Sequence, residues 1–255
     1  MPAGRGSGDA ERGEILRRLD ELGDDPAAAA CRKAVCRTIA QALADTGRLF
    51  WVTGLIVGPD RASGTSPFGF GDDQAVGVAT VAQIGGELAV GAVQLLMDGN
   101  LYAGSALIRQ LVEVEYLAFA FAEEHKVAAD WLRADRKVRH EFWQPKHLRE
   151  RAGGRFLRSD YGHHCDIGGH PTIDGMSLLP DHKRPSSAWL WADLAGHLQG
   201  IWKHLAVCAE RVIGGPIPEG WKAREVKPAI DAWLAADGLY AALQDLGEVL
   251  HGTPG

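Results

Sequence analysis

The sequence predicts an all-α protein: a helical bundle of five or six main helices with a Gly/His-rich irregular loop. No segment alternates apolar and polar residues at the two-residue period of a strand. Long stretches instead combine good helix formers with apolar residues spaced three and four apart. The chain has 255 residues, of which 46% are hydrophobic and 24% are charged, so it can bury one sizeable core.

Local signals mark the helix ends. Pro26 stands where a helix start tolerates proline, and Asp72 or Asp73 can cap a later helix. Asp98-Gly99-Asn100 predicts a tight break, and Gly214-Gly215-Pro216 stops a long helix. The predicted helices cover residues 11–22, 27–57, 72–97, 101–123, 125–151 and 185–212, with one or two short ones in 218–255.

Two segments are predicted to be irregular because they are rich in Gly and Pro, residues 58–72 and 155–185. The chain then divides into three parts. Residues 1–25 form an N-terminal extension with a short helix, and 26–215 form the helical bundle domain. Residues 216–255 form short C-terminal helices that pack on the bundle or trail it.

Residues 75–97 contain no Lys or Arg and are long enough to span a bilayer. Their Ala, Gly and Val content is only weakly hydrophobic, and Gln83, Glu87 and Gln94 interrupt it. We therefore predict a buried core helix and no membrane partner. The Gly-rich, charged residues 1–13 lack the apolar core of a signal peptide, and four cysteines are too few for a disulfide framework, which favours a cytoplasmic location.

Two apolar helices each carry a polar stripe. Thr80, Gln83, Glu87 and Gln94 share one face of the first; Tyr102, Ser105, Arg109, Glu113 and Tyr116 share one face of the second. The stripes either face solvent or face each other. In the second case Glu87, Arg109 and Glu113 would form a buried ionic cluster lining a pocket.

Positive charge is concentrated in one stretch of an otherwise acidic chain. Residues 133–158 hold nine Lys or Arg and three acids, a balance of +6, whereas the whole chain is −6. Permanent cations bind phosphate, so we expect this basic segment to bind RNA. Its candidate substrate-binding residues are Arg133, Arg136, Lys137 and His140.

Three hypotheses compete for the histidine segment that follows, which holds His163, His164, Cys165, Asp166 and His170. These residue types are good metal ligands, although adjacent histidines tend to diverge and no familiar zinc spacing is present. The segment can also be structural, with its imidazoles bonded to backbone carbonyls. Isolated histidines elsewhere are expected to be structural: His125, His182, His197, His204 and His251.

The third hypothesis is metal-independent RNA cleavage. Arg158 precedes His163 by four intervening residues and His164 by five, and both pairs fit Arg-x4–6-His. In this motif the chain resembles the HEPN-type helical ribonucleases. The resemblance implies that the histidine assists attack of a ribose 2′-hydroxyl and that the arginine stabilises the charged phosphate.

A second resemblance covers about residues 75–215. Segments 99–102, 106–113 and 128–132 look like a family of uncharacterised bacterial helical proteins, whose pattern is an Arg-x-x-x-Glu helix followed far downstream by Tyr and His-Pro. Arg109, Glu113, Tyr161 and His170 match that pattern. Cys165 departs from it, since serine is usual there. The resemblance implies a helical fold and a site at these residues.

The leading assignment from sequence is a HEPN-like endoribonuclease of a bacterial toxin or defence type, which needs neither metal nor cofactor. Its expected catalytic residues are Arg158, Tyr161, His163, His164 and His170, with Arg109 and Glu113 binding substrate. The alternatives are a non-catalytic helical protein that binds a ligand or partner, and a His/Cys/Asp metalloprotein. The partners considered are RNA and a second copy of the chain, as a homodimer.

Overall fold

The computed structural model describes residues 15, 17–57, 71–124, 126–180, 182 and 187–243. All regular structure in this part of the chain is helical and none of it is strand, which confirms the predicted all-α bundle. The helices include α2 (Pro26–Val57), α3 (Asp73–Met97), α4 (Leu101–Glu123), α5 (Val127–Arg133), α6 (Arg136–Phe142), α7 (Pro145–Arg151), α8 (Arg158–His164), α9 (Ser187–Ile213) and α10 (Ala223–Ala236), with a π-helical turn η2 (Cys165–Gly169) and a 3₁₀ turn η3 (Asp174–Leu178).

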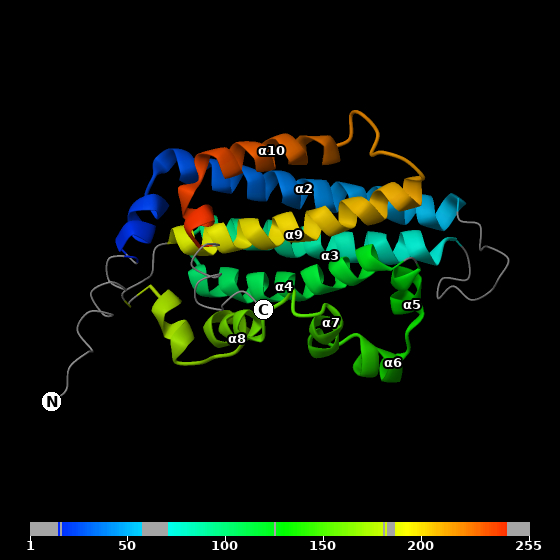
Figure 1. Ribbon diagram of the computed structural model, residues 1–255, viewed down its shortest axis with the longest axis horizontal. Helices are drawn as coiled ribbons and strands as arrows, with labels where there is room; N and C mark the ends of the chain where they lie inside the picture. Colours follow the sequence, from blue (N-terminus) through cyan, green and yellow to red (C-terminus); the bar gives the residue numbers. More distant parts are fainter. Residues whose placement is uncertain are drawn as a thin grey trace.

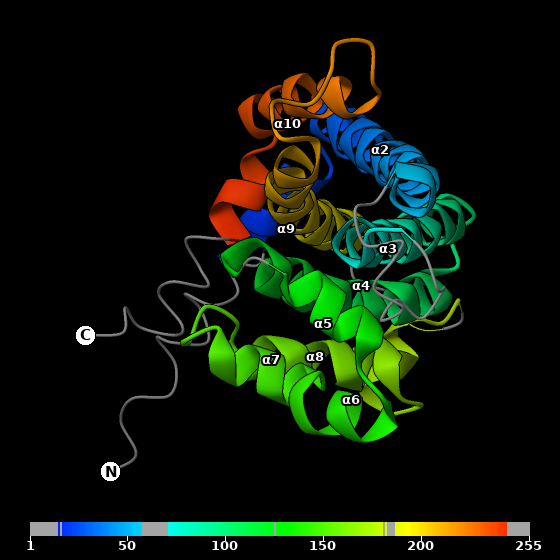
Figure 2. The same cartoon turned by 90° about the vertical axis from the view of Figure 1, so that its right-hand side faces the viewer.

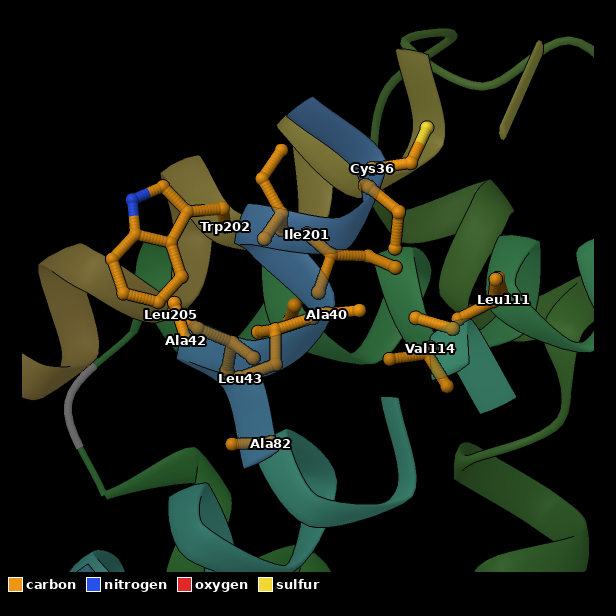
Figure 3. Close-up of a cluster of buried hydrophobic side chains, with 14 of the residues drawn as sticks. Cys36, Ala40, Ala42, Leu43, Ala82, Leu111, Val114, Ile201, Trp202 and Leu205 are labelled. Carbon is orange, nitrogen blue, oxygen red and sulfur yellow. The ribbon is translucent and has the colours of Figure 1, made fainter. Parts of the chain in front are cut away.

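The four long helices α2, α3, α4 and α9 lie side by side around one apolar core (Figure 1). Leu43 of α2, Val114 of α4 and Ile201 of α9 converge in its centre (Figure 3). Gly86 allows α3 to approach α2 closely, because a Cβ there would lie 2.7 Å from the backbone nitrogen of Ala44. Burial of these aliphatic side chains supplies most of the driving force for the bundle.

The predicted boundaries of α3 and α4 are confirmed. The Asp72 carboxylate accepts a hydrogen bond from the Gln74 backbone N–H at 2.9 Å, and the Asn100 side chain accepts from the Ala103 N–H at 3.3 Å. These caps satisfy N–H groups that the first turn of a helix leaves without partners.

Helix α3 is a core helix, as predicted. Among the described helices it alone is long and apolar enough to cross a membrane, yet 61% of its most apolar stretch is buried inside the bundle. It contacts α2, α4 and α9.

The predicted single helix over 125–151 is wrong, because the chain forms the three short helices α5, α6 and α7 there. Asp135 interrupts it by capping α6, where its carboxylate accepts from the Val138 N–H at 2.8 Å. Pro145 interrupts it again, since proline fits the first turn of α7 but would break a helix interior.

The prediction of an irregular segment over 155–185 is wrong for the helical stretches α8, η2 and η3. Tertiary contacts outweigh the local glycine content: Phe156 and Tyr161 pack against buried Tyr116 and Leu148. The π-helical turn lies directly on α4. Gly168 permits this contact, since a Cβ there would lie 2.5 Å from a side-chain atom of α4. The parts of the predicted irregular segments at 58–70, 181 and 183–185 lie outside the described residues.

The two polar stripes do not face each other, so of the two alternatives left open by the sequence the buried cluster of Glu87, Arg109 and Glu113 does not form. Glu87 is exposed, and Gln83 donates a hydrogen bond to the Gly47 carbonyl of α2 at 3.2 Å. The stripe of α4 instead faces α8 and η2. Helices α6, α7 and α8 lie on the side of α4 away from α2 and α10 (Figures 1 and 2).

Candidate functional site

Helix α8 carries two sets of polar side chains that contact different long helices. Tyr161 reaches Arg109 and Glu113 of α4, whereas Asp160 and His164 lie near α9. Asp160 and His164 are four residues apart, so they share one face of the helix. The short α8 therefore joins two neighbouring clusters.

The first cluster is compact and paired within itself. Arg109 Nη1 lies 2.7 Å from Glu113 Oε1, and the Tyr161 hydroxyl donates to the same oxygen at 2.9 Å. Arg109 Nη2 in turn donates to the Tyr161 hydroxyl at 2.5 Å. Burial and the bond to Glu113 raise the pKa of Tyr161, which stays protonated at neutral pH. This cluster holds α8 on α4.

In the second cluster, imidazole nitrogens and carboxylate oxygens converge on one point. His164 Nε2 and His197 Nε2 are 3.1 Å apart. Asp193 Oδ1 lies 3.4 Å from the His197 nitrogen and 3.7 Å from the His164 nitrogen. Asp160 Oδ1 is 3.6 Å from His164 Nε2. Asp160, His164 and His197 each present a ligand atom within 4.8 Å of the others.

Glu115 of α4 orients one of these imidazoles. Its Oε2 lies 2.7 Å from His197 Nδ1, so Nδ1 carries the proton and Nε2 is turned towards the cluster. Gly200, one turn further along α9, leaves room for this carboxylate, because a Cβ at that position would overlap it.

Burial and neighbouring charges set the ionisation of the cluster. His164 is 2% exposed, and burial lowers its pKa, which favours the neutral ring. Burial disfavours the charged form of His197 too, but Asp193 and Glu115 outweigh it and raise its pKa. Although burial opposes its ionisation, the adjacent imidazoles lower the pKa of Asp193. Without metal, the charged groups are therefore the carboxylates and one imidazolium.

This distribution leaves an excess of negative charge. Within the described part of the chain, Glu115, Asp160 and Asp193 form ion pairs with histidines only, and no Lys or Arg neutralises them. Three carboxylates against one imidazolium, that of His197, correspond to a local charge near −2. A divalent cation would balance that charge.

The remaining expected catalytic residues are not part of this centre, although the ring centroid of His163 is only 6.1 Å from that of His164. His163 is exposed and lines a cavity of about 650 Å³ beside η2 and η3, together with Asp166 and Asp174. Arg158 is exposed at the start of α8. His170 is exposed, and its backbone carbonyl accepts a hydrogen bond from the Tyr102 hydroxyl at 3.2 Å.

The expected substrate-binding cations divide into two groups. Arg133 Nε lies 2.5 Å from the buried carboxylate of Asp73, a contact that ties α5 to α3. Arg136, Lys137 and His140 are exposed on α6. Of all the site residues expected from sequence, the structure unites Arg109, Glu113 and Tyr161 in one cluster and puts His164 in the other.

Sequence reasoning missed most of the second cluster. The expectation that His197 is isolated is wrong, because Glu115 and His164 contact its two ring nitrogens, and Asp160, Asp193 and Glu115 were not foreseen. A signal was available: Asp160-x-x-x-His164 and Asp193-x-x-x-His197 repeat one spacing that puts both side chains on the same helical face. The first of these pairs was hidden because its segment was predicted to be irregular.

No family model, curated protein or solved structure matches this chain. The chemistry is therefore inferred from the geometry of the two clusters.

Proposed function

We propose that this protein is a metal-dependent hydrolase, in which His164, His197 and Asp193 bind one divalent transition-metal ion and Asp160 lies at its solvent side. The observation that carries the proposal is the triangle of ligand atoms, with edges of 3.1, 3.4 and 3.7 Å. Ligands about 2.0–2.1 Å from a tetrahedral zinc ion are roughly 3.3–3.4 Å from one another. The triangle matches this spacing.

The surroundings of the triangle support the same assignment. Metal-bound histidines usually donate their remote N–H to a carboxylate, and Glu115 occupies that position on His197 at 2.7 Å. The excess negative charge of the cluster favours a cation over a neutral ligand. Two imidazoles and a carboxylate suit zinc, iron or manganese better than magnesium or calcium.

The ligand set indicates an open coordination position. The three residues of the triangle leave at least one position, on the side of Asp160 and solvent, and no cysteine thiolate closes the set as in many structural zinc sites. The side chain of Asp160 is 45% exposed, so solvent reaches this side of the centre. A metal ion of this kind lowers the pKa of its bound water to about 7 and so supplies hydroxide for hydrolysis.

Metal content tests the proposal directly. Protein produced without an affinity tag in zinc-supplemented medium is expected to hold about one zinc per chain by elemental analysis. His164→Ala/His197→Ala should lose that zinc, because it removes two of the three ligands. The control is His163→Ala, which deletes the neighbouring exposed imidazole and should retain the metal. Folded wild-type protein that binds neither zinc, iron nor manganese would rule out the proposal.

Glu115→Gln provides a second, finer readout of the same centre. The amide can still contact His197 but cannot stabilise its polarised N–H as a carboxylate does, so zinc affinity should fall about 10- to 100-fold. Competition with a chromogenic chelator measures this change. Unchanged affinity would show that Glu115 does not position His197 for metal binding.

A HEPN-like ribonuclease is the second candidate function, and one observation favours it. Arg158 and His163 are both exposed on α8, and among the described residues no carboxylate pairs with Arg158. Both groups are open to solvent, as a phosphate-binding cation and an acid–base imidazole must be to meet a substrate.

The ribonuclease predicts cleavage of single-stranded RNA in the presence of EDTA, with a 2′,3′-cyclic phosphate product. DNA should remain intact, because it lacks the 2′-hydroxyl nucleophile. Arg158→Ala and His163→Ala should each slow cleavage about 10²- to 10⁴-fold. Because EDTA would abolish hydrolysis by a metal centre, this assay separates the two candidates. RNA left intact by folded wild-type protein would remove the ribonuclease.

A further inference from the structure

Helix α6 is unusual because it buries none of its seven residues. Four of them are basic or can become so: Arg136, Lys137, Arg139 and His140. Packing against the core therefore does not explain why these residues form a helix at this place. The helix holds its charged side chains out in solvent.

The cations of α6 are not compensated within the protein. Among the described residues, no carboxylate lies within ion-pair distance of Arg136, Lys137 or Arg139, whereas the exposed Lys222, which precedes α10, and Lys227 of α10 each pair with one. Like charges three residues apart, such as Arg136 and Arg139, repel each other. Arg136 and Lys137 also occupy the first turn, where the helix dipole disfavours cations.

The cations of α6 border a concave surface between α6 and α7. Arg136, Lys137 and His140 of α6 and His147 of α7 line a hollow of about 690 Å³, with Glu141 as its one acidic residue. The hollow is wide open to solvent, so a polymer strand can lie across it within reach of the cations. The repulsion between the cations would be relieved by phosphates held in the hollow.

Aromatic side chains follow directly after the cations. Phe142 is 48% exposed at the end of α6. Trp143 is half-buried, and the Arg151 guanidinium lies 5.0 Å from the centroid of its ring. Phe142 is not among the residues that line the hollow, but its exposed ring, at the end of the same short helix, is open to a strand that continues past the hollow, and unpaired bases stack on such rings.

We propose that the hollow between α6 and α7 binds single-stranded RNA. The Arg136 and Lys137 side chains neutralise adjacent phosphates in the hollow, and Phe142, outside the hollow, stacks on a base further along the strand. RNA fits better than duplex DNA because its loops and ends present unstacked bases to an aromatic ring. This binding needs no metal and is independent of the proposed hydrolase centre.

Fluorescence anisotropy with a labelled RNA of about 20 nucleotides, with EDTA present, tests the proposal. Wild-type protein should bind, and log K should fall linearly with log salt between about 50 and 200 mM. Arg136→Gln/Lys137→Gln should weaken binding about tenfold or more near 0.1 M salt and make the slope shallower by about 1.4, since each lost phosphate contact removes about 0.7 on a single strand. Phe142→Ala should weaken binding with no change in slope.

The matched control is Arg224→Gln/Lys227→Gln, which removes one Arg and one Lys from α10 on the opposite side of the bundle (Figure 1). It should bind RNA like wild type. Equal weakening in both double variants would overturn the site, because it would reflect net charge alone. Absence of RNA binding at low salt would also overturn it, as would stronger binding to phosphatidylserine vesicles than to RNA. Because α6 buries no residue, the variants should melt like wild type, which thermal denaturation checks.

Discussion

Asp237→Ala is expected to lower the free energy of unfolding by about 3–5 kcal/mol, because it leaves the Arg32 guanidinium buried without a counter-charge. The two side chains are 1% and 0% exposed, and Arg32 Nε lies 2.5 Å from Asp237 Oδ2. Asp237 also accepts hydrogen bonds from Trp233 Nε1 at 2.7 Å and from the Leu239 N–H at 3.1 Å. The substitution would therefore leave several donors unsatisfied at once.

Thermal denaturation checks this result. For a chain of this size the loss corresponds to a fall in Tm of about 6–20 °C. Lys227→Ala is the control, because its partner Asp231 is exposed and the loss of such a pair costs about 0–1 kcal/mol. The double variant Arg32→Leu/Asp237→Leu should be less destabilised than Asp237→Ala, since no buried charge is then unpaired. If Asp237→Ala melts like wild type, the pair does not tie the C-terminal helices to α2.

Zinc is expected to stabilise the protein strongly, and more so at about pH 8 than at about pH 6. At a free zinc concentration of about 100 Kd, binding contributes about 2.7 kcal/mol, or roughly 5–11 °C in Tm. Zinc binding needs His197 Nε2 without its proton, and Asp193 and Glu115 raise the pKa of that ring. Protons therefore compete with zinc through the neutral range. His164 competes less, because burial lowers its pKa.

In the metal-free protein, the contribution of His197 to stability falls with rising pH, whereas the contribution of zinc binding rises. Because the folded pKa of His197 is raised, its charged ring contributes stability that is complete below about pH 6.5 and is lost as the pH rises through the folded pKa. Buried His164 acts the other way, since its lowered pKa costs stability as the pH falls below about 6.5.

The pairwise difference in Tm with and without zinc, measured at each pH, isolates the binding contribution. His164→Ala/His197→Ala should show almost no zinc-dependent shift at either pH. If zinc raises the Tm of the wild-type protein equally at both pH values, zinc displaces no imidazole proton, and His197 is not a ligand.

Local chemistry determined much of the fold from sequence alone. The apolar content of α3 and the breaks at Asp72 and Asn100 predicted its bounds and those of α4, because capping and burial act over a few residues. Sequence reasoning also singled out Arg109, Glu113 and Tyr161, which the structure joins in one cluster. Short helices were less predictable, since α8 is stabilised by contacts of Tyr161 with α4 rather than by its own residues.

Only the tertiary structure decided which polar residues meet. The basic segment 133–158 looked uniform in sequence, yet Arg133 binds Asp73 inside the bundle while Arg136 and Lys137 lie in solvent. His197 looked isolated because its partners lie on α4 and α8, 82 and 33 residues away along the chain. A sequence fixes the side chains that each helix face presents, through the 3.6-residue period. Which faces meet depends on the packing of the whole bundle, and that packing is what assembles His164, Asp193 and His197 around one point.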